Sequence, residues 1–261
     1  MAEHPWQSVL ITGATSGLGR ALAEACAGPG ITLHLSGRDA GRLAEVAEAC
    51  AARGASVRPL VLDVTDRPAM EGWIASAGRL DLVIANAGIS GGTGTSVEPA
   101  AQVRRVFETN IGGVLNTALP AIAAMAEQAP DARGLRGQVA VIASLAAFVA
   151  APGAPAYCAS KATVQRWAEA LDASERRRGI RLHAVCPGYI RTPMTARNPF
   201  PMPWLMTPER AARRTLEGLA ARRLRIVYPR RLYALSRIIG ALPPGWRNRL
   251  LGAAPAKPQE G

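Results

Sequence analysis

The chain has 261 residues, of which 49% are hydrophobic and 19% charged, and 31 Lys and Arg against 19 Asp and Glu give it a net charge of +12. A chain of this length and composition buries a large core without disulfides or metals, which excludes a mostly disordered protein. The N-terminus lacks a basic segment followed by an apolar one, and no apolar run approaches about 18 residues. We therefore expect a cytoplasmic protein, neither secreted nor membrane-spanning.

All of the net positive charge lies in the last third of the chain. Residues 1–175 hold 13 basic and 16 acidic residues, a net charge of −3, whereas residues 176–261 hold 18 and 3, a net charge of +15. Only two of the 31 basic residues are lysines, Lys161 and Lys257. The four cysteines lie far apart without a CxxC pair, which favours reduced thiols over a zinc or redox site.

Short apolar runs alternate with helical patterns along most of the chain. The sequence predicts strands at residues 8–12, 31–36, 56–62, 81–85, 139–144, 181–186 and 222–227, and helices at 20–27, 40–53, 100–128, 156–178 and from Thr207 onward. Strands joined by helices indicate one doubly wound α/β domain of Rossmann type, a parallel sheet of about seven strands with helices on both faces. We assign residues 1–228 to this domain.

A glycine-rich turn, Thr-Gly-Ala-Thr-Ser-Gly-Leu-Gly at residues 12–19, follows the first predicted strand and opens a helix. Glycines let the backbone turn tightly and approach a pyrophosphate, whose charge is met by free amides and the positive end of the helix. The turn therefore predicts a dinucleotide site rather than an ordinary strand-to-helix loop. The residues expected to bind the cofactor here are Gly13, Thr15, Ser16, Gly17, Leu18 and Gly19.

The end of the second predicted strand indicates which dinucleotide binds. In dinucleotide folds an acidic side chain at this place binds the ribose 2′-hydroxyl of NAD, but here the residues are Ser36, Gly37 and Arg38. No carboxylate repels a 2′-phosphate, and the guanidinium can bind one. We therefore expect NADP(H) in preference to NAD(H). The alternative is that Arg38 is a surface residue beside Asp39, which would cap the next helix.

Tyr157 and Lys161 lie four residues apart on a predicted helix, so their side chains share one face. A phenol has a pKa of about 10 in water, so acid–base work at neutral pH needs a nearby cation that favours the phenolate. Lys161 supplies that cation. Ser144 ends the preceding strand, and its hydroxyl can orient a substrate carbonyl and stabilise the developing alkoxide. These three residues predict a proton-transfer site.

The T-G-x-x-x-G-x-G turn and the Tyr-x-x-x-Lys pair together resemble the short-chain dehydrogenase/reductase family, and the resemblance runs from about Ser8 to Met194. It implies reversible carbonyl reduction, with a hydride from the cofactor and a proton from Tyr157. It also implies that Asn110 is catalytic and holds a water-linked proton path to the lysine. The further cofactor contacts that it implies are Asp63, Val64, Asn86, Ala87, Gly88, Tyr157, Lys161, Pro187, Gly188, Ile190 and Thr192.

Two segments are expected to determine the substrate. Residues 193–210 predict a lid over an apolar substrate, with packing on the core or on another subunit as the alternative, because five large apolar side chains lie within residues 200–206. Residues 229–261 form a basic extension with apolar side chains at helical spacing. This extension can dock on its own domain or touch an anionic membrane peripherally. We expect no nucleic acid as a partner, because no helix-turn-helix or aromatic stacking platform accompanies the charge.

The sequence thus predicts an NADP(H)-dependent oxidoreductase that interconverts a carbonyl and a secondary alcohol on a hydrophobic small molecule, with no metal. Two alternatives stay open: a membrane-surface ketoreductase of a lipid or steroid-like substrate, and a non-catalytic dinucleotide-sensing protein. The resemblance further implies a homodimer or homotetramer that associates through the helices at 100–128 and 156–178.

Overall fold

The computed structural model describes residues 5–94, 96–252 and 256–259. Its centre is one seven-stranded sheet in the order β3-β2-β1-β4-β5-β6-β7, with every neighbouring pair parallel. The strands are β1 (Ser8–Ile11), β2 (Thr32–Gly37), β3 (Ser56–Val61), β4 (Leu82–Ala85), β5 (Gly137–Ile142), β6 (Ile180–Pro187) and β7 (Arg225–Tyr228). The order reverses between β1 and β4, so the loops after these strands diverge and leave a crevice at the carboxyl edge of the sheet.

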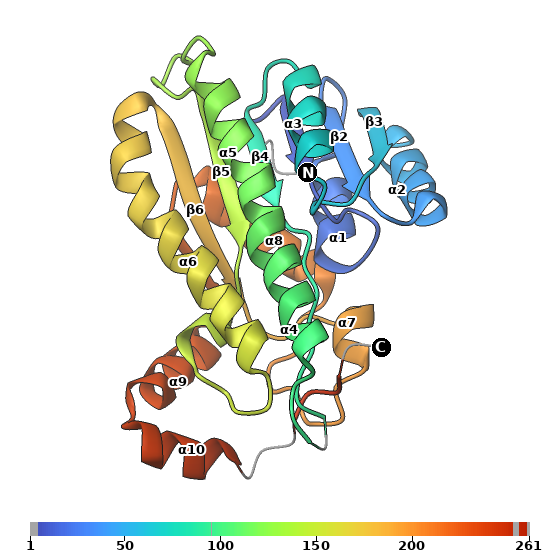
Figure 1. Ribbon diagram of the computed structural model, residues 1–261. Coiled ribbons are helices and arrows are strands. Elements are labelled where there is room, and N and C mark those ends of the chain that lie inside the picture. The colour runs from blue at the N-terminus through green and yellow to red at the C-terminus, as the bar shows by residue number, and fades with distance from the viewer. Residues whose placement is uncertain (1–4, 95, 253–255, 260–261) are drawn as a thin grey trace.

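Helices cover both faces of the sheet. They are α1 (Gly17–Cys26), α2 (Ala40–Ala51), α3 (Arg67–Ser76), α4 (Ala100–Phe107), α5 (Gly113–Ala126), α6 (Pro155–Glu175), α7 (Pro193–Ala196), α8 (Pro208–Ala220), α9 (Arg230–Ala241) and α10 (Pro244–Gly252). The core formed by α1, α2 and α8 is separate from the core formed by α3 and α5. Figure 1 shows α5 and α6 in front of the sheet and α8 behind it. The predicted doubly wound fold is therefore confirmed.

Strand β1 shows why the sheet is buried on both faces. Val9 and Ile11 point into the core with α1 and α2, whereas Leu10 points into the core with α3 and α5. Successive side chains of a strand alternate between faces, so a strand covered by helices on both sides has to be apolar throughout. Cover by helices on both faces therefore explains the continuous apolar runs in the sequence.

Three elements differ from the sequence-based prediction. Helix α3 was not predicted, although Asp66 caps it by accepting from the Ala69 amide (3.1 Å) and Pro68 lies in its first turn. The helix predicted over residues 100–128 is divided into α4 and α5 by a π-helical turn, Glu108–Gly112. The last strand begins at Arg225 rather than at residue 222, because Arg222 has a φ of +52° and belongs to a turn.

The C-terminal extension docks on the domain through α9. Leu232 packs against the core beside β5 and α6, and the Tyr233 ring meets the edge of Phe148 with 5.1 Å between ring centroids. Arg225 also donates from Nη1 to the Tyr233 hydroxyl (3.0 Å). Helix α9 is therefore docked on its own domain, one of the two alternatives given for this segment. Among the described residues no helix has the length and apolarity needed to cross a membrane.

Candidate active site

The glycine turn between β1 and α1 is held against β4 by Asn86. Its Nδ2 donates to the carbonyls of Thr12 (2.9 Å) and Gly13 (3.1 Å), and the Thr12 hydroxyl accepts from the amides of Asn86 (3.0 Å) and Ala87 (3.1 Å). Gly13 has a φ of +65°, and a Cβ there would lie 2.8 Å from the Ala87 Cα. The backbone of the turn and the N-terminus of α1 form a cradle of the kind that binds phosphates.

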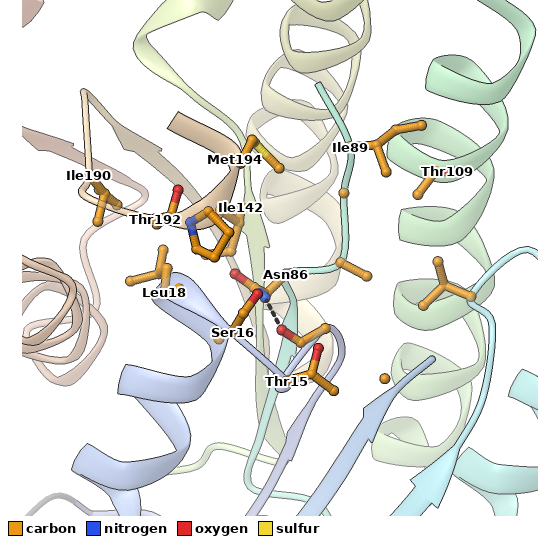
Figure 2. A pocket seen from close by; sticks show the side chains of 18 of the residues that line it. Thr15, Ser16, Leu18, Asn86, Ile89, Thr109, Ile142, Ile190, Thr192 and Met194 are labelled. Atoms are coloured by element: carbon orange, nitrogen blue, oxygen red, sulfur yellow. Dashed lines mark hydrogen bonds between the residues drawn. The ribbon is translucent and has the colours of Figure 1, made fainter. Parts of the chain in front are cut away.

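The segment after β6 closes over this turn. Thr192 begins α7 by accepting from the Thr195 amide (3.2 Å), while the Thr195 hydroxyl accepts from the Thr192 amide (3.0 Å). A Cβ at Gly17 would lie 2.9 Å from the Thr192 methyl group, so the two chain segments are in close contact. Figure 2 shows Thr192 and Met194 above Thr15, Ser16 and Leu18 of the turn.

Two cations lie at the end of the cavity beside β2 and β3. Arg38 Nη1 is 3.8 Å from Asp63 Oδ2, and 69% of its side chain is exposed. Arg42, which sequence reasoning missed, lines the same cavity from the start of α2. Asp39 caps α2 by accepting from the Arg42 amide (3.0 Å). Arg38 nevertheless lines the cavity, so the cap at Asp39 does not exclude a role for Arg38 in binding. The signal for Arg42 was its place in the first turn of the helix, three residues after the capping residue Asp39.

All of the predicted cofactor-binding residues line one cavity of about 470 Å³ at the carboxyl edge of the sheet. They come from the glycine turn after β1, from the ends of β2, β3, β4 and β6, and from α6, as expected for a site at the point where strand order reverses. The lining residues that the sequence did not indicate include Ile89, Thr109, Ile142, Ala143, Met194 and Thr195. Their side chains lie in loops and at helix turns where no motif marked them; Figure 2 shows Ile89 and Thr109 on one side of the cavity.

Tyr157, Ser144 and Lys161 meet at the inner end of this cavity. Burial raises the pKa of Tyr157 to about 12, and a hydrogen bond with the Ser144 side chain acts in the opposite direction. Lys161 Nζ lies 6.0 Å from the centre of the Tyr157 ring and donates to the Ile142 carbonyl (2.8 Å). The expected lowering of the phenol pKa by Lys161 is therefore not found; here the phenol is protonated at neutral pH, the form that can donate a proton.

Lys161 has lost much of its contact with water. Burial, followed by the positive charge of Lys257, lowers the pKa of Lys161 to about 8. An ammonium with a pKa near neutrality can exchange protons with its surroundings at little cost.

Asn110 does not line the cavity but supports it from behind. It lies fully buried in the π-helical turn, its Oδ1 accepts from the Ile89 amide (2.8 Å), and its Nδ2 donates to the Ile89 carbonyl (3.0 Å) and to Ser160 Oγ (3.1 Å). A Cβ at Gly88 would lie 3.0 Å from Asn110 Oδ1 and 3.3 Å from Lys161 Nζ. Asn110 thus fixes the loop after β4 directly beside the lysine.

A second cavity of about 430 Å³ adjoins the first and shares Ser144 and Tyr157 with it. Its walls are mainly apolar. They include Leu145, Val149, Tyr189, Phe200, Leu232, Leu235 and Ile239. Three of these come from α9, so the docked extension forms part of the second cavity.

The predicted lid covers this cavity only in part. Phe200 lines it and meets the Tyr189 ring with 6.2 Å between centroids. Met206 instead packs in the core and pairs with Ile190 in an isolated bridge, while Trp204 and Leu205 are exposed. The segment thus lines the second cavity at Phe200 and packs in the core at Met206, and its role as a substrate lid stays a prediction.

A glycine-lined cavity at the reversal point of a parallel α/β sheet defines a dinucleotide-binding protein. A Tyr–Ser–Lys group at its inner end, facing a second cavity, places that protein among the oxidoreductases that act on alcohol and carbonyl groups.

The chain belongs to the short-chain dehydrogenase/reductase family, because the model for short chain dehydrogenases matches residues 7–200. It is 35% identical over 261 residues to an uncharacterised oxidoreductase of Myxococcus xanthus, covering 97% of this chain and 98% of that one. It is also 35% identical over 193 residues to the granaticin polyketide synthase putative ketoacyl reductase 1 of Streptomyces violaceoruber, covering 72% of this chain and 69% of that one.

Two solved structures are similar over most of their length. A short-chain dehydrogenase from Sphingobium yanoikuyae in complex with NADPH is 27% identical with a TM-score of 0.77, covering 94% of this chain and 95% of that one. A short chain dehydrogenase/reductase from Burkholderia phymatum in complex with NAD is 23% identical with a TM-score of 0.77, covering all of both chains (100%), and its likeness concerns the fold. The protein is therefore an oxidoreductase whose fold binds a nicotinamide dinucleotide.

Proposed function

We propose that this protein uses NADP(H) to interconvert a ketone and a secondary alcohol on an apolar small molecule, with Tyr157 as the acid and base. One observation carries the proposal: Tyr157 and Ser144 line both the glycine-lined cavity and the apolar cavity. A group shared by a cofactor cavity and a substrate cavity is where a proton and a hydride can reach one carbonyl.

The cofactor preference rests on charge at the β2 end of the cavity. Arg38 and Arg42 both line it, and Gly37 leaves no carboxylate at the end of β2. Two guanidinium groups can hold a 2′-phosphate by charge-assisted hydrogen bonds, whereas the ribose hydroxyl of NAD gives them no negative charge to bind. The NADPH complex of the similar Sphingobium protein is consistent with this preference.

The chain's own groups would act in reduction as follows. The Ser144 hydroxyl donates a hydrogen bond to the carbonyl oxygen, and Tyr157 transfers its phenolic proton to that oxygen as negative charge develops on it. The bound cofactor supplies the hydride that the carbonyl carbon gains. The Lys161 ammonium, 6.0 Å from the ring centre, would offer positive charge to the phenolate that remains, against the burial that raises the pKa of Tyr157. Asn110, by holding Ile89, keeps the loop beside Lys161 in place.

The proposal is tested with a series of unbranched 2-ketones of increasing length, each reduced with NADPH and with NADH. We expect reduction with NADPH, with kcat/KM rising as the chain lengthens because each buried methylene adds about 0.8 kcal/mol of binding. Equal kcat/KM with NADH would remove the cofactor preference. A protein that binds NADPH but turns over no ketone or alcohol would instead be the non-catalytic dinucleotide-sensing protein.

If the protein acts on a lipid-like substrate at a membrane surface, α10 rather than the docked α9 is the helix that would contact the membrane. Trp246 is 75% exposed, Leu250 is also exposed, and both lie beside arginines. Sedimentation with anionic vesicles that is lost in Trp246→Glu would favour that form over a freely soluble enzyme, since the substitution removes the apolar contact and adds negative charge.

A further inference from the structure

The C-terminal tail segment, residues 256–259, returns to the carboxyl edge of the sheet. The Gly94 amide donates to the Lys257 carbonyl (2.9 Å), and Gln259 Nε2 donates to the Val97 carbonyl (3.1 Å). On its other side, a Cβ at Gly153 would lie 2.9 Å from the Ala256 Cα. The tail segment is therefore held between the loops that follow β4 and β5; Figure 1 shows it in dark red beside the loop before α4.

This path brings Lys257 to the catalytic tyrosine. Its Nζ lies 4.0 Å from the centre of the Tyr157 ring and donates to Ser90 Oγ (2.9 Å). Lys161 approaches the same ring from the cofactor cavity. Both lysines of a chain with 31 basic residues thus converge on one side chain. A cation over an aromatic face is attracted to it, which helps to fix the Lys257 ammonium there.

Among the described residues in the wall of the apolar cavity, Lys257 alone carries a charge. Within the described part of the chain no carboxylate forms an ion pair with it, and burial lowers its pKa to about 8. An ammonium in an apolar wall costs free energy unless an anion or further acceptors satisfy it. A ligand in this cavity is placed to supply that anion.

We propose that Lys257 is an anion-binding residue of the substrate cavity and that the substrate is an apolar oxo acid, whose carboxylate lies on Lys257 and whose oxo group faces Tyr157. The substrate class rests on the proposed function; the anion site itself rests on the geometry of the tail segment. Because Nζ stands directly over the Tyr157 ring, a carboxylate bound to it lies close to the oxo group that is reduced. The rest of the molecule occupies the apolar wall formed by Leu145, Phe200 and α9.

Binding tests the anion site without turnover. Octanoate and octanamide have nearly the same shape and differ in charge, so calorimetry with the full chain saturated with NADP⁺ isolates the effect of the charge. We expect octanoate to bind at least about 10-fold more tightly, as for a partly buried charge-assisted hydrogen bond. Lys257→Met should abolish this preference and Lys257→Arg should keep part of it. Arg231→Met, which removes an exposed arginine of α9, is the matched control and should keep the whole preference.

Turnover separates this inference from the proposed function. The ratio of kcat/KM for 2-oxo-octanoate to that for 2-octanone should fall at least about 10-fold in Lys257→Met. An unchanged ratio, with both ketones reduced, overturns the anion site and leaves the proposed reaction standing. If neither ketone is reduced while octanoate still binds selectively through Lys257, the proposed reaction fails and the anion site stands. No preference for octanoate in the unsubstituted protein overturns the anion site outright.

Discussion

At the scale of single residues, the proposed preference for NADP(H) rests on the arginines at one end of the cofactor cavity. Arg38→Ala should weaken NADPH by about 10-fold and NADH much less, because only NADPH carries the 2′-phosphate that a charge-assisted hydrogen bond would hold. Because the Arg38 side chain is largely exposed to solvent, the expected loss of affinity is at the lower end of the range for a charge-assisted hydrogen bond. Quenching of protein fluorescence during titration with each cofactor measures both constants.

Arg67→Ala, a substitution of an exposed arginine at the start of α3, serves as the control for Arg38. It changes the net charge equally but lies outside the cavity, so both cofactors should keep their affinity. Equal losses for NADPH and NADH in Arg38→Ala would contradict recognition of the 2′-phosphate.

The buried side chain of His183 makes the free energy of unfolding depend on pH. Its Nδ1 donates to the Arg223 carbonyl (2.8 Å), and the Gln138 amide, oriented with its nitrogen toward the ring, donates to Nε2 (3.0 Å). Burial lowers the pKa of His183 from 6.5 to about 4. Below pH 6.5 the unfolded chain therefore takes up a proton that the folded chain does not, so the free energy of unfolding falls as pH falls.

Between pH 6.5 and about 5, this group should cost about 1–2 kcal/mol of stability, before most carboxylates titrate. Urea unfolding at the two pH values measures the loss. His183→Gln, which retains His34 and cannot take up the proton, should show a correspondingly smaller loss whatever its absolute stability. A loss of the same size in both proteins would show that His183 is not the responsible group.

The residues that sequence reasoning found and missed differ in how local their signals are. Tyr157 and Lys161 lie one helical turn apart, and the glycine turn is contiguous, so spacing alone identified them. Lys257 reaches Tyr157 only because the chain returns from α10, and no local pattern encodes a contact of that kind. The pKa of Tyr157 was likewise misjudged, since it depends on burial by distant segments.

At the scale of elements, the turn between β1 and α1 depends on the absence of side chains. A Cβ at Gly19 would collide with the Gly13 carbonyl and lie 2.5 Å from Asn86 Nδ2. Gly19→Ala should therefore weaken NADPH by at least about 10-fold and lower Tm, because the turn and the Asn86 contacts must shift together. Fluorescence titration and thermal melting measure the two effects.

Gly28→Ala is the matched control for Gly19→Ala, since a Cβ at Gly28 would meet nothing within 4 Å. It should leave both NADPH binding and Tm near those of the unsubstituted protein. Full retention of NADPH affinity in Gly19→Ala would mean that the cofactor does not depend on the close packing of this turn.

The inner strands were predictable because they are apolar runs in a sheet covered on both faces, and most helices because their apolar side chains recur. The edge strand β3, by contrast, is mostly exposed. Helix α3 was missed because its apolar stretch is short, although its cap at Asp66 and its early proline are both visible in the sequence. The π-helical turn could not be predicted in this way. The contacts that Asn110 makes from this turn with Ile89 and Ser160 could not be predicted either, because these residues are far apart in sequence.

At the scale of the whole molecule, association is expected through α4, α5 and α6. Phe107 and Leu119 are large apolar residues exposed on α4 and α5, and a second copy would cover them. Light scattering at micromolar concentration should give the mass of a dimer or tetramer, and Leu119→Arg should shift it toward the monomer. Thermal melting of the unsubstituted protein and of the Leu119→Arg variant checks that both are folded. If the unsubstituted protein has the mass of a monomer, the expected association is wrong.

The charge of +12 also takes a different meaning at this scale. All of the net positive charge belongs to the last third of the chain, whose α9 lines the apolar cavity and whose tail segment carries Lys257 into its wall. The cations placed for chemistry are few: Arg38, Arg42 and Lys161 line the cofactor cavity, and Lys257 lines the adjoining apolar cavity.

The central claim is that Tyr157 transfers the proton in carbonyl reduction, and Tyr157→Phe tests it most directly. Single-turnover reduction of a ketone that the unsubstituted protein accepts should slow by about 10³-fold, within the range for loss of a general acid. NADPH should still quench protein fluorescence with nearly the same affinity, which shows that the cofactor cavity is intact. A Tyr157→Phe protein that binds NADPH and reduces the ketone at the original rate would contradict the account.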